Sequence, residues 1–493
     1  MYDQSSVTRT PATDVPGRPE LPDGRSITPV QGARAGALAG AAGGVAFGVI
    51  MALIGFLPTV AALVRADSPV VGTAVHMVIA VILGAGFGAL AVRQTPDGGD
   101  LLFWGSIYGV AWWFAGPLTL LPALSGNPVR WSVSAAQELF PSLVGHLLYG
   151  AVTAAVFAWA TRRYRDRRDP DTDIRAAAVA ALAGVACGVL LSLVLRPMQG
   201  GGYSLVIAGS FLGAGYGLLF GARREGTGPA LIRGTVYGLL WWVVAGLTLP
   251  SLPAGDGLDW TARAARDAVP ALPGYLLIGA GTAAVYGLVD GFLRALRSGD
   301  VRDRYADRLI AGRAVSVLHG IGAGLVGGAV FTAVMVAVGF LPTVAALAGS
   351  ESVGVGLILH LLISMTLGAG YAILFRGRSF DAAAGIGWGV SYGLLWWVLG
   401  NLLLLPLLLG ELPQWSAEMV AAAFPSLIGH LLYGAALGLV YQRLEAWVAP
   451  PSPGRSRAVS DRTRARDDQL RTAAPALWSL TVFLAALVPV LVS

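Results

Sequence analysis

Long apolar stretches separated by short polar segments form the dominant pattern along this chain of 493 residues. The stretches are about 20 residues long, the length of an α-helix that crosses a hydrocarbon core about 30 Å thick. We therefore predict thirteen membrane spans, at about 36–57, 71–92, 101–122, 138–160, 176–196, 203–222, 230–250, 269–293, 316–340, 354–375, 383–405, 421–443 and 474–492. The expected fold is an all-α, polytopic helical membrane protein.

Parts of the sequence occur twice, 284 residues apart and without a gap. Phe56–Leu63 returns as Phe340–Leu347, Trp112-Trp113 returns as Trp396-Trp397, and Gly145–Ala151 returns as Gly429–Ala435. A third, decayed copy lies between them at an offset of 129 and keeps Tyr237-Gly238 and Trp241-Trp242. Each copy holds four predicted spans, so we expect three four-helix repeats followed by a C-terminal helix.

Segments rich in arginine, aspartate and proline separate the three copies and define the domain organisation. The first 31 residues are polar, rich in proline and without an apolar core, which is typical of a disordered tail rather than a signal peptide. We predict a cytoplasmic tail at 1–31, repeat 1 at 32–161, a linker at 162–175, repeat 2 at 176–297, a linker at 298–315, repeat 3 at 316–447, a linker at 448–473 and a transmembrane helix at 474–493.

The placement of arginine predicts the orientation in the membrane. Arginine is interpreted as confined to loops and tails, and it gathers in the links between repeats and in the loops that join second to third spans. Cytoplasmic loops carry the excess of basic residues in membrane proteins. We expect a cell-membrane protein with a cytoplasmic N-terminus and an outer C-terminus. Because each repeat has an even number of spans, the three repeats are expected to be parallel.

The composition supports the membrane class and excludes several functions. Hydrophobic residues make up 55% of the chain and charged residues 13%, against about 25% charged residues in a soluble domain. The net charge of +6 is not interpreted as a nucleic-acid signal, so the lipid bilayer is the expected partner. Cys187 is the only cysteine, which excludes an intramolecular disulfide and a cysteine-based metal cluster. No catalytic motif is present, and we expect a non-enzymatic protein.

Glycine and tryptophan recur at helical spacing within the spans. Gly36, Gly40, Gly44 and Gly48 form a stripe on the first helix, which we interpret as tight helix packing because small residues let backbones approach closely. The tryptophan pairs lie near mid-span, where an indole N–H needs a partner. We interpret them as packing residues, with the lining of a flat or apolar ligand as the alternative.

Four of the five histidines occupy equivalent positions in repeats 1 and 3, whereas repeat 2 has Leu205 and Tyr275 at these positions. On the fourth helix, a serine precedes the histidine by four residues and a tyrosine follows it by three, which places all three on one helix face. The predicted polar pocket, or metal site, consists of His76, His146, Tyr149 and Ser142 in repeat 1 and of His360, His430, Tyr433 and Ser426 in repeat 3.

Two interpretations of the histidines are open. An ionisable residue inside a membrane is a functional hypothesis by default, but a neutral imidazole also holds helices together by a hydrogen bond. A functional pair would ligate a metal, ligate haem or relay protons. A carboxylate-rich ion site is not expected, because no acidic residue of the spans lies beside the pair in sequence.

The blocks with a histidine-bearing second helix, an aromatic third helix and a fourth helix with Gly-His-Leu-Leu-Tyr-Gly resemble the uncharacterised YagU-like inner-membrane proteins. The resemblance covers 36–160 and 316–443 well and 176–293 weakly. It implies a four-helix membrane unit with paired histidines and no established chemistry. Three fused copies with an additional helix depart from the usual single unit.

These observations predict a permease-like or stress-related scaffold whose paired histidines face an outward pocket in repeats 1 and 3. The alternative is a membrane redox protein in which His76/His146 and His360/His430 bind haem or a transition metal, and a third possibility is a purely structural bundle. The first hypothesis needs no cofactor. The substrate, the transport direction and the oligomeric state are not specified by the sequence.

Overall fold

The computed structural model describes residues 27–92, 98–161, 170–199, 202–220, 227–251, 258–298, 306–378, 381–413, 415–448 and 480. Within these ranges the chain forms helices and turns and no strand. The predicted all-α class is therefore confirmed. The predicted tail, most of the linkers and, apart from Leu480, the last span lie outside the described residues. Leu480 is helical and 3% exposed, and it belongs to the main hydrophobic core.

Each predicted repeat contains four long helices. In repeat 1 they are α1 (Pro29–Leu53), α3 (Pro69–Ala91), α4 (Gly98–Ala115) and α7 (Phe140–Ala160); in repeat 2, α8 (Pro170–Gln199), α9 (Gly202–Phe220), α10 (Thr227–Trp241) and α12 (Leu272–Ser298); in repeat 3, α13 (Ala306–Ala337), α15 (Val353–Phe375), α16 (Ala382–Trp396) and α19 (Phe424–Val448). Ten helical segments in the described ranges are long and apolar enough to cross a membrane, and α8 and α9 contain shorter apolar segments. The chain is a multi-pass membrane protein.

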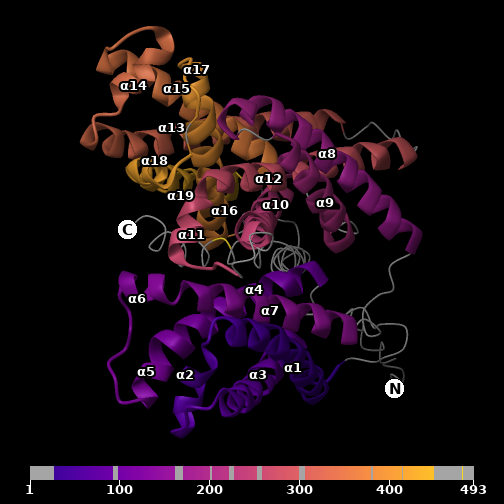
Figure 1. Ribbon diagram of the computed structural model, residues 1–493. Helices are drawn as coiled ribbons and strands as arrows, with labels where there is room; N and C mark the ends of the chain where they lie inside the picture. Colours follow the sequence, from indigo (N-terminus) through magenta and orange to yellow (C-terminus); the bar gives the residue numbers. More distant parts are fainter. Residues whose placement is uncertain are drawn as a thin grey trace, which may run out of the picture.

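Short helices connect the long ones on one side of the molecule (Figure 1). They are α2 (Leu57–Ala61), α5 (Leu121–Leu124), α6 (Val133–Glu138), α11 (Ala262–Asp267), α14 (Leu341–Ala345), α17 (Leu405–Leu408) and α18 (Ala417–Ala422). We call this side the connector side; it corresponds to the predicted outer side. Ser132 caps α6 by accepting a hydrogen bond from the Ala135 N–H, as expected for a short interfacial helix before the bend at Pro141.

The first and second helices of repeats 1 and 3 cross at glycines. A Cβ atom built on Gly40 would lie 2.4 Å from the carbonyl oxygen of Ala80, and one built on Gly84 would lie 2.4 Å from the Gly40 Cα. In repeat 3, a Cβ atom on Gly368 would lie 2.1 Å from the Gly320 oxygen. No side chain larger than hydrogen fits at these crossings, so the interpretation of the glycine stripe as tight packing is confirmed.

The third and fourth helices cross in the same way in all three repeats. The pairs in contact are Gly105 and Gly150, Gly234 and Gly279, and Gly389 and Gly434. In each pair, a Cβ atom on one glycine would lie between 1.9 and 2.3 Å from the carbonyl oxygen of the other. Repeat 2 therefore keeps this crossing although it has lost both histidines.

Each third helix widens into a π-helical segment before it reaches the connector side. The segments are Gly116–Leu120, Trp242–Thr248 and Trp397–Leu404. In the first two, a threonine hydroxyl donates to the carbonyl oxygen five residues earlier, at 2.8 Å for Thr119 and 2.7 Å for Thr248. Such segments free backbone carbonyls for other partners and are frequent at functional sites.

Neighbouring repeats join by one repeated contact between a third helix and the second helix of the next repeat. Gly99 of α4 packs against the ring of Phe220 on α9, and Gly228 of α10 packs against Phe375 on α15. At the first joint, Phe103 also stacks on Phe220, with ring centroids 5.5 Å apart. In repeat 1, α4 and α7 face repeats 2 and 3, whereas α1 and α3 lie on the far side (Figure 1).

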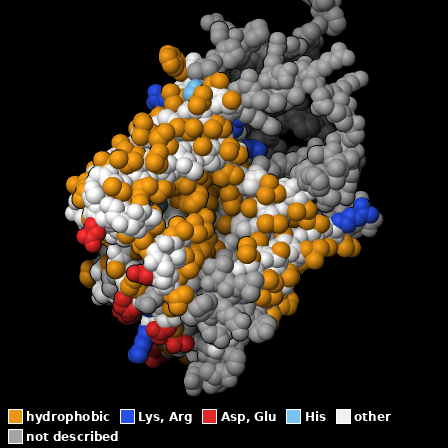
Figure 2. Space-filling model, turned by 90° about the horizontal axis from the view of Figure 1, so that it is seen from above, with side chains coloured by type: hydrophobic (Ala, Val, Ile, Leu, Met, Phe, Trp, Pro, Cys, Tyr) orange, Lys and Arg blue, Asp and Glu red, His pale blue; other side chains and the backbone are white. Residues whose placement is uncertain are grey.

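Hydrophobic side chains cover much of the visible described surface, while acidic side chains gather near one edge (Figure 2). On α3, for example, Val70, Val78 and Ile82 are between 60% and 79% exposed. In water such a surface would be an aggregation site, whereas in a bilayer it is the face that contacts lipid.

We predict that Gly320→Ala lowers the free energy of unfolding by about 1–3 kcal/mol, because overpacking forces the helices apart. Its methyl group would lie 2.3 Å from the Gly368 oxygen. The control is Gly322→Ala on the same helix, where no atom lies within 4 Å; there we expect no loss, or a gain of up to about 1 kcal/mol. An SDS titration of the purified protein measures both changes, and equal effects of the two variants would contradict this account.

Candidate functional site

The two histidines of repeat 1 lie on opposite sides of one phenylalanine. Phe47 of α1 contacts His76 of α3 edge-on, with ring centroids 5.5 Å apart, and His146 of α7, with centroids 4.9 Å apart. A Cβ atom on Gly145 would lie 1.9 Å from the Phe47 ring. Phe47 is thus held against the α7 backbone between the two imidazoles. The structure brings the predicted pair together through this shared neighbour.

Each histidine donates one N–H to a backbone carbonyl. His76 donates from Nε2 to the Gly44 oxygen at 2.9 Å, and His146 donates from Nδ1 to the Ser142 oxygen at 2.7 Å. A carbonyl only accepts, so the proton positions follow from these contacts. When neutral, the two rings are opposite tautomers, with the lone pair on Nδ1 of His76 and on Nε2 of His146.

Repeat 3 has the same arrangement around Phe331. The ring centroids of Phe331 lie 5.2 Å from those of His360 and 4.7 Å from those of His430. His360 Nε2 donates to the Gly328 oxygen at 3.0 Å, and His430 Nδ1 donates to the Ser426 oxygen at 2.8 Å. The equivalence expected from the repeated sequence therefore extends to the hydrogen-bonded atoms.

The two tyrosines of the predicted pocket connect helices. The Tyr149 hydroxyl donates to the Ala80 oxygen at 2.8 Å, and the Tyr433 hydroxyl donates to the Ser364 oxygen at 2.8 Å. Both side chains are buried. Each one ties the fourth helix of its repeat to the second helix by a hydrogen bond, and neither lines the cavity described next.

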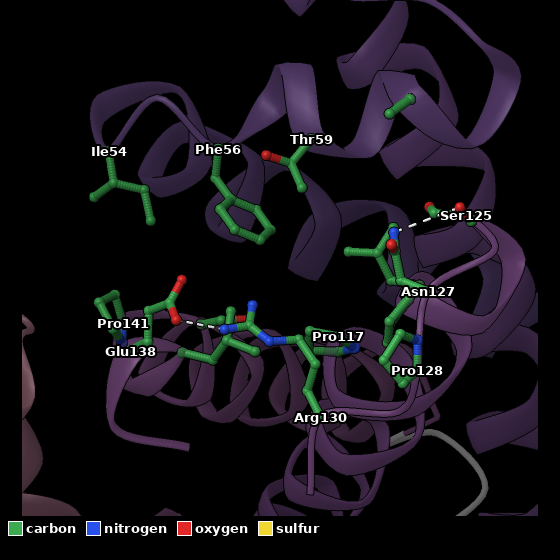
Figure 3. A pocket seen from close by; sticks show the side chains of 15 residues that line it. Ile54, Phe56, Thr59, Pro117, Ser125, Asn127, Pro128, Arg130, Glu138 and Pro141 are labelled. Atoms are coloured by element: carbon green, nitrogen blue, oxygen red, sulfur yellow. Dashed lines mark hydrogen bonds and ion pairs between the residues drawn. The ribbon is translucent and has the colours of Figure 1, made fainter. Parts of the chain in front are cut away.

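A cavity of about 720 Å³ opens in repeat 1 at the connector side, between α2 and the chain that links α4 to α7 (Figure 3). Its apolar walls include Ile54, Phe56, Pro117 and Leu121, and its polar groups come from Thr59, Ser125, Asn127, Arg130, Glu138 and Ser142. The Ser142 hydroxyl lies 3.3 Å from His146 Nδ1. The cavity therefore ends one helical turn from His146, and Ser142 is the predicted pocket residue that lines it.

An ion pair between Arg130 and Glu138 lies on the wall of this cavity (Figure 3). The two side chains are 36% and 68% exposed. Pairs this exposed contribute about 0.2–1 kcal/mol, so the pair opens at little cost in free energy. Repeat 3 has Ala422 at the position of Glu138 and so lacks this carboxylate.

The histidine pairs do not fit a haem or a metal ion. A porphyrin bound between His76 and His146 would need the space that Phe47 fills. A metal ion would find one free nitrogen on each ring, and among the described residues no three His, Cys, Asp or Glu side chains come close enough to hold a metal. The geometry supports imidazoles that hydrogen-bond and pack.

The indole N–H groups have partners near the π-helical segments and the start of each fourth helix. The second tryptophan of each pair donates to a backbone oxygen: Trp113 to Leu139, Trp242 to Ala268 and Trp397 to Ala423, at 2.9–3.2 Å. Trp131 and Trp260 donate to Thr119 and Thr248, and Trp415 donates to the Leu402 oxygen. These bonds support the packing interpretation of the tryptophans.

The expectation that arginine is confined to loops and tails is wrong at one position. Arg233 of α10 is 1% exposed and lies 3.9 Å from the carboxylate of Asp100 on α4, which is 0% exposed. Its guanidinium also lies 5.1 Å from the centre of the Phe220 ring. The pair joins repeats 1 and 2 at their shared contact. Sequence reasoning missed it because the partners are 133 residues apart.

The fifth histidine also has a partner. His319 Nδ1 lies 2.7 Å from the Glu445 carboxylate, and next to it the Ser316 and Tyr441 hydroxyls are 2.5 Å apart. Both contacts join α13 to α19, far from the connector side in sequence. His319 is therefore separate from the Phe331 site.

No protein-family model, curated protein or solved structure matches the chain.

We predict that Asp100→Ala lowers the free energy of unfolding by about 3–5 kcal/mol, because it leaves the Arg233 charge buried without its partner. Asp100→Leu combined with Arg233→Leu should restore most of the stability, because replacing a buried ion pair by apolar residues is often neutral. An SDS titration of the three proteins measures this. A single variant as stable as the unchanged protein would show that the pair does not hold the joint together.

Proposed function

We propose that this chain is a non-enzymatic, permease-like membrane protein that takes up a small ligand from the outer side of the cell membrane into the cavity of repeat 1. The observation that carries the proposal is the cavity of about 720 Å³ that opens at the connector side and ends at Ser142, one turn from His146. Ligand pockets are typically about 300–1,000 Å³, apolar with a few polar groups.

Three features support this function over a purely structural bundle. The cavity lies beside a π-helical segment, its wall carries a weak, exposed ion pair, and its inner end lies next to a histidine with one uncommitted nitrogen. The proposed orientation, with the connector side outside, follows from the arginine distribution. Membership of the YagU-like family is part of the proposal and rests on Gly145–Gly150 and Gly429–Gly434.

The proposal predicts that Ser142→Cys reacts with a membrane-impermeant maleimide added to intact cells. The experiment uses a Cys187→Ala background, since Cys187 is the only native cysteine. Thr153→Cys is the matched control, because Thr153 lies on the same helix and is 0% exposed. Labelling of Ser142→Cys alone is the expected result. A failure to label in intact cells, with labelling after permeabilisation, would refute the outward-facing pocket.

The haem or metal alternative has its own test. We expect protein purified from metal-replete cells to show no Soret band and to contain far less than one metal ion per chain, because Phe47 and Phe331 fill the space between the histidines. An absorption spectrum and elemental analysis measure this. A Soret band or stoichiometric metal that is lost in the His146→Ala, His430→Ala double variant would favour the redox function instead.

A further inference from the structure

The lone pair of His146 gives the inner end of the cavity a hydrogen-bond acceptor. Nδ1 donates its proton to the Ser142 oxygen at 2.7 Å. A neutral imidazole has a single N–H, so Nε2 only accepts. Any group that binds directly to this nitrogen must therefore bring its own proton.

Nε2 points toward open space at the π-helical segment. A Cβ atom built on Gly116 would lie 4.0 Å from Nε2, and no other atom lies within 4 Å of that position. The next residue, Pro117, lines the cavity. Gly116 therefore leaves room for a ligand atom between Pro117 and His146.

The rest of the lining offers little to an anion. Arg130 is the only basic side chain among the lining residues, and it is paired with Glu138. Phe56, Pro117 and Leu121 give the cavity an apolar wall, and the face of an aromatic ring such as Phe56 attracts cations. A carboxylate or phosphate would have to displace Glu138 from Arg130 and would meet a lone pair at Nε2.

We propose that the ligand of this cavity binds through an N–H or O–H donor, an ammonium or a hydroxyl group on an apolar body, which hydrogen-bonds to His146 Nε2. This inference rests on the proposed function and names the chemical class of its ligand. An anionic group in the same place is excluded by repulsion from the lone pair.

Repeat 3 provides a control within the same molecule. His430 makes the same Nδ1 bond to the Ser426 oxygen. A Cβ atom on Gly400, the counterpart of Gly116, has only Trp396 within 4 Å, and Asn401 replaces Pro117. His430 should not respond to a ligand of the repeat 1 cavity.

The test is a titration of the protein, labelled with ¹⁵N-histidine in lipid nanodiscs, with hexylammonium, 1-hexanol or hexanoate. His146→Asn and His430→Asn variants assign the resonances. We expect hexylammonium and hexanol to shift the Nε2 resonance of His146 saturably, and hexanoate to leave it unchanged. The His430 resonance should stay in place with all three.

Two further variants test the position of the bound group. Gly116→Ala puts a methyl group in front of Nε2 without a clash and should weaken hexylammonium binding about tenfold, which corresponds to about 1.4 kcal/mol. Gly400→Ala should have no effect. An equal effect of the two alanine variants would place the bound group elsewhere and overturn the inference.

The outcomes separate this inference from the proposed function. If hexanoate shifts the His146 resonance as strongly as hexylammonium, or if none of the three shifts it while Ser142→Cys is still labelled from outside, the ligand class is wrong and the outward pocket stands. If Ser142→Cys is not labelled from outside, the proposed function itself fails.

Discussion

Direct contact between glycine backbones is the constraint on which this structure depends. In a bilayer, apolar side chains gain nothing by leaving lipid for protein, so helices are held by close packing and by hydrogen bonds between them. The crossings of Gly105 with Gly150, and of its two counterparts, supply that contact in each repeat. A glycine one turn further along the third helix, Gly109, packs on the carbonyl of His146 itself. The position of the candidate site is therefore set by the backbone, before any polar side chain contributes.

The packing and functional interpretations of the histidines are compatible. His76 and His146 each use one nitrogen to hold a backbone carbonyl, which satisfies a polar group inside the membrane. The hydrogen bond that His146 makes also determines which nitrogen remains for a ligand, because the proton is held on the side away from the cavity. A structural role for one edge of the ring thus orients the other edge.

The spans, the glycine crossings and the pairing of the histidines could be predicted from the sequence, because each depends on local composition or on spacing along one helix. The Phe47 wedge could not, since nothing in the sequence shows that a residue of the first helix reaches both imidazoles. The π-helical segments and the cavity beside Pro117 depend on how the helix ends relax against α2 and α6. Asp100 and Arg233 were missed for a similar reason, because their pairing requires the joint between repeats 1 and 2.

That joint is heterologous: Gly99 meets Phe220 and Gly228 meets Phe375, so each repeat presents a different surface to the next one. An assembly of identical separate subunits using such a contact would carry any mutation at every position simultaneously. In a single chain, each position mutates independently and the order of the units is inherited with the gene. Tyr275 could replace a histidine in the middle repeat while His146 and His430 remained on either side. Fusion therefore permits division of labour among units that share one scaffold.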